Sequence, residues 1–327
     1  MADNRKTVLV MEAMSKAGRA PFEARSDIRL LPFPAKMSRA ELLALMQREP
    51  RIDAMILGVQ QIGPAEIAAS KHLAVVARIG VGYDAIDVPA LTKARIPLMT
   101  TGTANSPSVA EKALFFMLTL AKRGTALDAM VREGRWSDRM TDMPVDLCNK
   151  TVLVVGFGRI GSRTVKRCLA MEMEVLVADP YVDAAKIKAA GAEPVSLDVG
   201  LPRADFLTVH CPKTAETTGL IGARQLALMK PTAYVINTAR GGLVDEAALA
   251  AALAQKKIAG AGLDVLLEEP PPVDHPLFKL NNVMLAPHMA GVTREAFDRM
   301  AEQAALNVLS VFDGKTIAEN VVNREVV

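Results

Sequence analysis

The sequence predicts an α/β protein built from two doubly wound parallel sheets. Short apolar runs rich in β-branched residues alternate with longer alanine-rich stretches, which is the order of parallel βα units. The apolar residues stand on consecutive positions, as in strands that helices cover on both faces. The runs fall into two series, and a length of 327 residues suits two domains.

The first series of expected strands lies in the N-terminal third of the chain: Thr7–Met11, Asp53–Leu57, Leu73–Ile79 and Pro97–Thr101. Between them, Arg39–Gln47 is expected to form a helix because Ser38 is a suitable N-cap. A longer helical region is expected from Ser108 to Trp136, with a break at Gly124.

The second series contains the expected strands Thr151–Val155, Glu174–Ala178, Asp205–His210, Ala233–Asn237, Ile258–Asp264 and Val283–Ala286. The segment Thr293–Phe312 predicts an amphipathic helix that packs back against the first domain. Turn-forming residues at 100–108 (TTGTANSPS) indicate a domain boundary. We therefore expect one domain from residues 1–103 and 292–327, with a second domain, residues 104–291, inserted into it.

Composition excludes several functional classes. With 39 basic and 36 acidic residues, the net charge of +3 is too small to indicate a nucleic-acid partner. The longest apolar stretch, Ala113–Ala121, is far shorter than the roughly 20 residues of a membrane span. Cys148, Cys168 and Cys211 have no ligand spacing, so we expect neither a disulfide framework nor a metal site. Without a recognisable secretory signal, a cytoplasmic location is expected.

The segment TVLVVGFGRIG at residues 151–161 predicts a dinucleotide-binding, Rossmann-like turn. Its glycines, Gly156, Gly158 and Gly161, follow an apolar strand and precede a helical stretch. In this arrangement the first allows a tight turn, the second lets the backbone approach a pyrophosphate, and the third lets helix and strand pack closely. Asp179 ends the next strand, where its carboxylate is expected to bind the ribose hydroxyls and favour NAD over NADP.

A second match to this glycine pattern, GVGYDA at residues 80–85, is interpreted differently. No good helix is expected after it because Pro89 interrupts, and no acidic residue follows at the required spacing. We do not expect this segment to bind a nucleotide. Its glycines instead suit a nest of N–H donors for a small carboxylate, with an ordinary turn as the alternative.

Four histidines are the candidates for acid–base chemistry. His72 is expected at the surface, and His275 lies in the proline-rich segment PPPVDHPLF. His210 and His288 each follow an expected strand, at the edge where α/β proteins form their sites. Position alone does not separate these two.

A family resemblance is carried by the segments ARIGVGYDAID, NSPSVAEKAL, VREGRW, VVGFGRIG, HCPKTAETTGLI, INTARGGLVDE, AGLDVLLEEP and LAPHMAG. The chain resembles the D-isomer-specific 2-hydroxyacid dehydrogenases, which include phosphoglycerate dehydrogenase, glyoxylate/hydroxypyruvate reductase and D-lactate dehydrogenase. The resemblance runs from about Leu73 to Gly291, roughly two thirds of the chain. It implies that residues 104–291 bind NAD and that the other domain binds the substrate.

The resemblance implies a catalytic set of three residues. Arg240 matches the family's substrate-binding arginine, Glu269 its acid, and His288 its acid–base histidine. Within the cofactor contacts, Asp264 matches the aspartate that holds the nicotinamide carboxamide, and His210 falls on the adenine-ribose side.

Further contacts follow from the same resemblance. Substrate contacts are implied for Gly80, Val81, Gly82, Asn105 and Arg240. Cofactor contacts are implied for Gly156, Gly158, Arg159, Ile160, Gly161, Asp179, His210, Cys211, Pro212, Thr217, Thr238, Ala239, Asp264 and Gly291.

The catalytic residue types suit the oxidation of a 2-hydroxy acid, in which a hydroxyl proton leaves while hydride passes from C2 to the nicotinamide. An imidazole transfers such a proton in either direction near neutral pH. A carboxylate beside it stabilises the imidazolium and fixes its tautomer. A guanidinium holds carboxylate and carbonyl oxygens together and stabilises charge that develops on the carbonyl oxygen.

We therefore expect an NAD-dependent oxidoreductase that interconverts a small D-2-hydroxy acid and its 2-keto acid. Two alternatives remain, a short D-3-phosphoglycerate dehydrogenase and a non-catalytic, NAD-sensing protein similar to corepressors. Phosphoglycerate dehydrogenases usually carry an arginine in the segment equivalent to LGVQQIG, where this chain has Gln60 and Gln61. These neutral side chains favour a substrate with an uncharged or compact tail, such as hydroxypyruvate or glyoxylate.

A homodimer is expected because Leu127–Trp136 matches the family's dimerisation helix. Trp136 is the chain's only tryptophan and suits the core of an interface, with a position in the protein core as the alternative. The residues after His288 suffice for one helix and a tail, so we expect no regulatory domain like that of long phosphoglycerate dehydrogenases.

Overall fold

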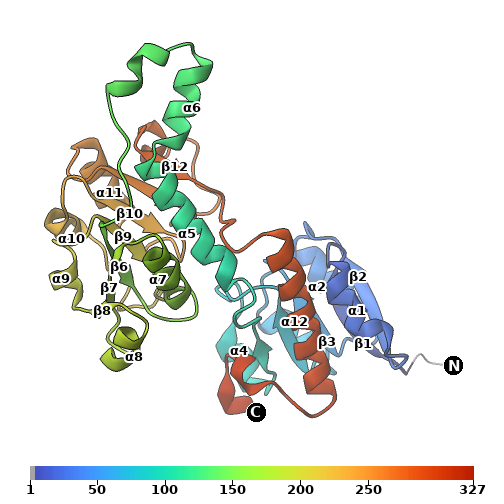
Figure 1. Cartoon of the computed structure of the whole chain (residues 1–327). Helices are drawn as coiled ribbons and strands as arrows, with labels where there is room; N and C mark the ends of the chain where they lie inside the picture. Colours follow the sequence, from blue (N-terminus) through green and yellow to red (C-terminus); the bar gives the residue numbers. More distant parts are fainter. Residues whose placement is uncertain (1–3) are drawn as a thin grey trace. The chain divides into compact units, whose positions relative to one another are not determined.

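The computed structural model of the protein describes residues 4–327, which form two compact units (Figure 1). One comprises the chain up to Asn105 together with Val292–Val327, and the other is Ser106–Gly291. From the sequence we expected the boundaries between the two domains to follow residues 103 and 291. Each unit contains one parallel sheet, which confirms the predicted fold class. Residues 1–3 of the first expected domain lie outside the described residues.

The first unit contains a five-stranded parallel sheet in the order β2-β1-β3-β4-β5. Its strands are β1 (Lys6–Met11), β2 (Ile28–Phe33), β3 (Ala54–Leu57), β4 (Val75–Arg78) and β5 (Leu98–Met99). Strand β2 was missing from the sequence prediction because it contains Arg29 and Pro32. It is an edge strand that pairs with β1 alone, and an edge tolerates a proline that lacks an N–H group.

Helices of the first unit are α1 (Lys16–Glu23), α2 (Arg39–Arg48), α3 (Pro64–Ala68), α4 (Val88–Lys93) and α12 (Arg294–Phe312), with short 3₁₀ turns η3 (Ala318–Asn320) and η4 (Arg324–Val326). The predicted cap of α2 is confirmed: the Ser38 hydroxyl accepts a hydrogen bond from the Glu41 N–H, and the Glu41 carboxylate accepts one from the Ser38 N–H. Helix α12 packs on α1 so closely that a β-carbon on Gly18 would lie 2.6 Å from that of Ala301.

The second unit contains a seven-stranded parallel sheet in the order β12-β11-β10-β9-β6-β7-β8. Its strands are β6 (Thr151–Val155), β7 (Glu174–Ala178), β8 (Glu193–Pro194), β9 (Phe206–Val209), β10 (Tyr234–Asn237), β11 (Gly260–Leu263) and β12 (Val283–Leu285). The edge strand β8 was not predicted, because two residues are too few for a recognisable pattern. Since all the strands run in one direction, the loops that follow them meet at one edge of the sheet.

Helices cover both faces of this sheet (Figure 1). They are α5 (Ser106–Ala121), α6 (Gly124–Arg132), α7 (Gly161–Ala170), α8 (Ala184–Ala189), α9 (Leu197–Gly200), α10 (Ala223–Leu228) and α11 (Glu246–Ala254), with 3₁₀ turns η1 (Trp136–Met140) and η2 (Pro276–Lys279). Apolar side chains of α5 and α7 form the core on one face, and those of α10 and α11 form it on the other. This double cover explains the uninterrupted apolar runs of the strands.

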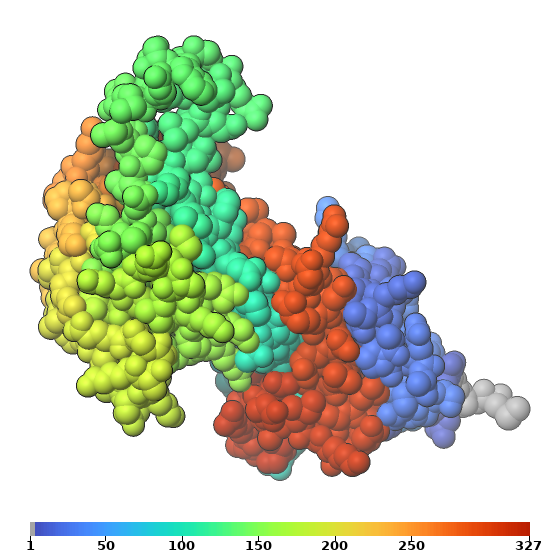
Figure 2. Space-filling model, viewed as in Figure 1, coloured from blue at the N-terminus to red at the C-terminus, as the bar shows by residue number. Residues whose placement is uncertain are grey.

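A segment from α6 to η1 projects from the rest of the second unit (green in Figures 1 and 2). The chain turns between α5 and α6 at Arg123, which is in the left-handed conformation, one residue before the expected break at Gly124. The expected helix through Trp136 is shorter than predicted, because α6 ends at Arg132 and Trp136 begins η1. No helix among residues 4–327 combines the length and the apolar character that a membrane span needs.

Candidate active site

The candidate cofactor residues of the second unit follow its strands directly. Gly156 follows β6, Asp179 follows β7, His210 follows β9, Thr238 follows β10 and Asp264 follows β11. The carboxyl ends of parallel strands are where α/β proteins bind their ligands. The sheet therefore collects at one edge residues that lie far apart in the sequence.

The three glycines of the turn after β6 differ in the space that a β-carbon would find at each of them. A β-carbon on Gly156 would lie 2.7 Å from the Cys211 nitrogen, and one on Gly161 would lie 1.9 Å from the Gly156 oxygen. Gly156 also has a φ of +94°, which other residues rarely adopt. A β-carbon on Gly158 would meet no atom within 4 Å. The packing of the described residues thus requires Gly156 and Gly161 but leaves the space beside Gly158 open.

The Asp179 carboxylate connects the ends of two strands. One of its oxygens accepts a hydrogen bond of 2.7 Å from the Phe157 N–H in the glycine turn, and the other accepts one of 2.9 Å from the Tyr181 N–H. Asp179 therefore shapes the glycine turn, a role that the sequence reasoning missed. Its contact with a ribose remains a prediction.

His210 lies in an environment unsuited to proton exchange with solvent. It is buried, and its Nε2 is 3.0 Å from the Thr208 hydroxyl. Burial lowers the pKa of His210 to about 3, so the ring is neutral near pH 7. Burial also raises the pKa of the neighbouring Cys211 to about 11, which keeps that side chain a thiol. Their positions after strands left His210 and His288 equivalent, and the family resemblance implied His288; these surroundings likewise favour His288 for acid–base chemistry.

The turn after β10 is shaped by the Asn237 side chain. Its amide nitrogen donates to the Arg240 carbonyl at 2.8 Å, and its amide oxygen accepts from the Ala239 N–H at 3.0 Å. The Arg240 guanidinium is half-buried and donates to the Ala239 carbonyl at 2.7 Å. Sequence reasoning missed Asn237, although it stands within the NTARGG motif.

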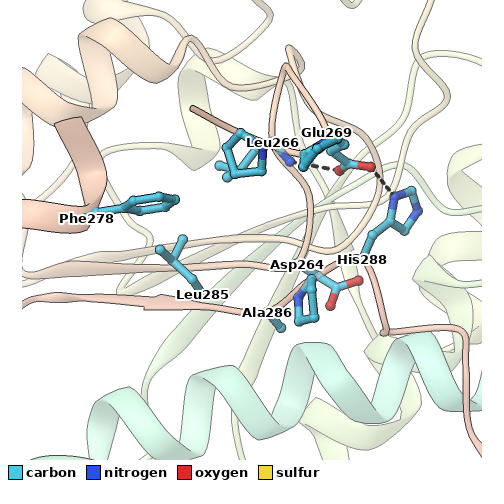
Figure 3. A pocket seen from close by; sticks show the side chains of 10 residues that line it. Asp264, Leu266, Glu269, Phe278, Leu285, Ala286 and His288 are labelled. Carbon is cyan, nitrogen blue, oxygen red and sulfur yellow. Dashed lines mark hydrogen bonds and ion pairs between the residues drawn. The ribbon is translucent and has the colours of Figure 1, made fainter. Parts of the chain in front are cut away.

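His288 and Glu269 meet as the sequence resemblance implies (Figure 3). The His288 Nδ1 lies 2.6 Å from one Glu269 carboxylate oxygen, and the other oxygen accepts a hydrogen bond of 3.0 Å from the Leu266 N–H. Both side chains are partly exposed, so small molecules can reach them. Because Nδ1 faces the carboxylate, the ring's Nε2 remains for another partner.

His288 is held in an unusual backbone conformation. Its φ is +53°, in the left-handed region that non-glycine residues seldom occupy, and its N–H donates to the Asp264 carbonyl at 2.7 Å. The buried Asp264 carboxylate accepts hydrogen bonds from the N–H groups of Met289 at 3.0 Å and Ala290 at 2.7 Å. Burial raises the pKa of Asp264, although these N–H groups oppose the shift. Asp264 thus fixes the backbone on both sides of the His288 side chain.

A cavity of about 530 Å³ opens beside the Glu269–His288 pair. Figure 3 shows Phe278 and Leu285 on its apolar side, with Glu269 and His288 at the other. This volume lies within the usual range of small-molecule sites.

In the first unit, the GVGYDA segment has features of a carboxylate-binding nest. Gly80 has a φ of +146°, and the N–H groups of Val81 and Gly82 donate to no group among residues 4–327. The Asn105 side-chain oxygen is buried and likewise has no partner in the described part of the chain. One expectation here was wrong: helix α4 follows the segment, since Pro89 lies in its first turn, where a proline is tolerated.

The two glutamines considered for substrate selection have different surroundings. The buried Gln60 side chain accepts from the Gly58 N–H at 2.9 Å and donates to the Ala35 carbonyl at 3.1 Å. Gln61 is exposed. Both ends of the Gln60 amide are therefore engaged in hydrogen bonds to backbone groups of its own unit.

The remaining predicted residues are placed as follows. The Thr217 hydroxyl donates to the Pro212 carbonyl at 2.7 Å, within its own loop. Arg159 is exposed at the glycine turn. His72 is exposed as expected, whereas His275 forms an unexpected pair with Glu246 at 3.0 Å. No group of three His, Cys, Asp or Glu side chains in the part of the chain that the structure describes could hold a metal ion.

Comparison with known proteins agrees with this geometry. Residues 114–290, or 177 of the 327, match the family model described as D-isomer specific 2-hydroxyacid dehydrogenase, NAD binding domain. This chain belongs to the D-isomer specific 2-hydroxyacid dehydrogenases.

Relatives within this family differ in name and in length. A glyoxylate reductase of Korarchaeum cryptofilum is 37% identical over 324 residues, covering 98% of this chain and 96% of that protein. A D-3-phosphoglycerate dehydrogenase of Archaeoglobus fulgidus is 42% identical over 288 residues, covering 88% of this chain but 51% of that protein. The crystal structure of a glyoxylate reductase from Paecilomyes thermophila has a TM-score of 0.87 and 29% identity, with 98% of this chain and 99% of that chain covered. The chain thus spans about half the length of the phosphoglycerate dehydrogenase that it matches.

As a D-isomer specific 2-hydroxyacid dehydrogenase, the chain has an NAD-binding domain in its second unit, and its cofactor is NAD. The residues present fit that cofactor. The Thr238 hydroxyl and the His210 Nδ1 are buried without hydrogen-bond partners among residues 4–327, although such atoms are normally paired. A ligand with polar groups would satisfy them, and the open space beside Gly158 would admit its phosphates.

Alanine substitutions at two of the glycines should have different effects, one on the stability of the fold and the other on NADH binding. Gly161→Ala forces a methyl group against the Gly156 carbonyl, so we expect a loss of about 1–3 kcal/mol in the free energy of unfolding. Gly158→Ala should leave that energy within about 0.5 kcal/mol of the parent. It should nevertheless weaken NADH binding by about tenfold or more, because the methyl group occupies the phosphate approach.

Urea unfolding and NADH fluorescence titration measure the two effects. Gly124→Ala, at the exposed first residue of α6 outside the site, controls for the loss of a glycine as such, because its φ lies outside the left-handed region and a β-carbon there would come no closer than 3.5 Å to another group. Unchanged NADH affinity in Gly158→Ala would contradict the assignment of this turn to the phosphates.

Proposed function

We propose that this chain is an NAD-dependent oxidoreductase that interconverts a small D-2-hydroxy acid and its 2-keto acid. The observation that carries the proposal is the 2.6 Å contact between His288 and Glu269, beside a cavity in an NAD-binding domain. A histidine with a carboxylate partner suits a reaction that moves one proton with each hydride.

His288 acts as the acid–base group in this proposal. Its Nδ1–H is directed to Glu269, so Nε2 gives a proton to the keto oxygen in reduction and takes the hydroxyl proton in oxidation. The Glu269 carboxylate stabilises the imidazolium that reduction requires. When bound, NADH supplies the hydride for the keto carbon.

Arg240 and the first unit hold the substrate in the same proposal. The guanidinium pairs with the substrate's carboxylate and keto oxygens and stabilises the charge that develops on the latter. The N–H groups of Val81 and Gly82, next to Gly80, bind the carboxylate, and Asn105 supplies a polar contact. The unsatisfied hydrogen-bonding groups of this segment support these roles.

The residues proposed to hold NAD are those of the second unit's carboxyl edge. They are Gly156, Gly158, Arg159, Ile160, Gly161, Asp179, His210, Cys211, Pro212, Thr217, Thr238, Ala239, Asp264 and Gly291. Of these, Asp179 binds the ribose hydroxyls and disfavours a 2′-phosphate.

The proposed substrate is a compact 2-keto acid such as hydroxypyruvate or glyoxylate. The Gln60 amide is neutral and is occupied by its own backbone, so it offers no charge to a substrate phosphate. The relative covered at nearly full length is named a glyoxylate reductase. A short D-3-phosphoglycerate dehydrogenase is the second candidate, because a relative of that name has 42% identity.

We also propose a homodimer formed through the segment from α6 to η1. The Trp136 residue is 63% exposed, so the alternative of a core tryptophan is excluded. Val131 and Met140 on the same projecting segment, and Met143 just after it, are also exposed. Such apolar surface is typical of an interface between protein chains.

His288→Asn tests the proposed reaction directly. We expect kcat for 2-keto acid reduction to fall by about 10²- to 10⁴-fold, the usual contribution of a positioned acid–base group. NADH affinity should change little. His72→Asn, at an exposed histidine outside the site, is the matched control and should keep the parent's turnover. Near-normal turnover of His288→Asn in steady-state assays would refute the acid–base role.

Competition between two substrates tests the proposal that the substrate is a compact 2-keto acid without a phosphate group. Under saturating NADH, hydroxypyruvate should have a higher kcat/KM than phosphohydroxypyruvate, because Gln60 and Gln61 offer no positive charge to a phosphate. The opposite order would identify a short phosphoglycerate dehydrogenase.

Light scattering tests the assembly. At micromolar concentration we expect a mass about twice the chain's 35.0 kDa. Trp136→Glu should shift the protein toward the monomer, since a charge at the centre of an apolar interface is costly. A parent protein that is monomeric at this concentration would contradict the proposal.

A further inference from the structure

The Glu246 carboxylate lies outside the predicted site but is connected to it. Glu246 is the first residue of α11, and its side chain is 15% exposed. One of its oxygens accepts a hydrogen bond from the Leu267 N–H, and the other lies 3.0 Å from the His275 Nε2. The His275 Nδ1 accepts from the Leu277 N–H, so Nε2 carries the hydrogen that faces Glu246.

Both partners of Glu246 belong to the loop between β11 and η2, which also contains Glu269. The Leu266 N–H, one residue before the Leu267 N–H that Glu246 binds, donates to the Glu269 carboxylate at 3.0 Å. The same part of the loop is close to the Arg240 turn. A β-carbon on Gly241 would lie 1.9 Å from the Leu266 carbonyl oxygen.

We propose that Glu246 is a positioning residue for the acid–base pair, which it serves by fixing the loop that presents Glu269 to His288. This proposal rests on the proposed function of that pair. Two successive backbone N–H groups connect the two carboxylates, because the Leu267 N–H donates to Glu246 and the Leu266 N–H donates to Glu269. His275 fixes the far end of the loop through the other oxygen of Glu246.

A purely structural role for Glu246 makes a different prediction. An acidic residue in the first turn of a helix stabilises that helix by about 0.3–1 kcal/mol through the helix dipole. That effect would change the free energy of unfolding but not the pH dependence of catalysis. Positioning of Glu269 changes both kcat and the pH at which reduction declines. The charged groups that face His288 within its unit are the carboxylates of Glu269 and Asp264, and Lys112 of α5 acts on Asp264.

The test compares Glu246→Ala, Glu246→Gln and the control Glu268→Ala. Glu268 is a neighbouring acid on the same loop, exposed and without a hydrogen bond or ion pair among residues 4–327. We expect Glu246→Ala to lower kcat/KM for reduction about 10- to 100-fold, as displaced catalytic groups do. NADH affinity should stay within about twofold, because the glycine turn is untouched.

The pH profile separates positioning from stability. Reduction needs the imidazolium of His288, and a loosened Glu269 stabilises it less. The alkaline decline in kcat/KM should therefore move to lower pH in Glu246→Ala. Glu246→Gln keeps an acceptor for the Leu267 N–H, so it should recover much of the loss. Glu268→Ala should behave like the parent.

Each outcome decides one question. Parent-like kcat/KM and pH profile in a folded Glu246→Ala would overturn the inference, even if its unfolding temperature fell. If Glu246→Ala does not fold, an intermediate loss and shift in Glu246→Gln supports the inference, and parent-like kinetics overturn it. His288→Asn, assayed in parallel, tests the proposed function separately: only near-normal turnover there removes the reaction on which the inference rests.

Discussion

The common direction of the seven strands in the second unit is the constraint on which the site depends. Helices cover both faces of that sheet, so the strands consist mostly of apolar residues. Polar residues directly follow four of the strands, β7, β9, β10 and β11, and parallel pairing places those ends at one edge. The glycine turn, Asp179, His210, the Arg240 turn and Asp264 come together for this reason.

Carboxylates at this edge shape loops as well as offering charge. Asp179 accepts two backbone N–H groups, Asp264 accepts two more, and Glu269 accepts one while it faces His288. Hydrogen bonds to an ionised carboxylate are stronger than those between neutral groups, so each acid orders several residues of backbone. A substitution at one of these acids changes loop geometry together with charge. For that reason an alanine variant of such an acid is informative when it is compared with a conservative variant at the same position and with a control variant of a neighbouring acid.

Much of the fold and of the candidate site could be predicted from the sequence. The glycine turn was recognisable because strand, turn and helix follow each other within a few residues, and local patterns record such contacts. Strand β2 was missed because Pro32 is a poor strand residue except at an edge, and an edge position depends on the whole sheet. The helix α4 was missed because Pro89 was interpreted as a break rather than as a first-turn residue.

Contacts between distant residues were beyond sequence reasoning. Glu246 and His275 are 29 residues apart, and although Glu246 ends the family segment INTARGGLVDE, nothing in the sequence links the two residues. Their pairing emerges only from the packing of α11 against the following loop. The resemblance already implied His288 rather than His210, but the physical reason, burial of one ring and a carboxylate partner for the other, is visible only in the structure.

The most direct test of the central claim is a crystal structure of the protein with NADH and oxamate, a 2-keto acid analogue whose amide carbonyl accepts no hydride. The proposed chemistry predicts the oxamate carbonyl oxygen within about 3 Å of the His288 Nε2 and beside the Arg240 guanidinium. It also predicts the oxamate carboxylate on the N–H groups of Val81 and Gly82. An oxamate molecule bound with its carbonyl oxygen away from His288, next to a correctly bound NADH, would contradict the claim.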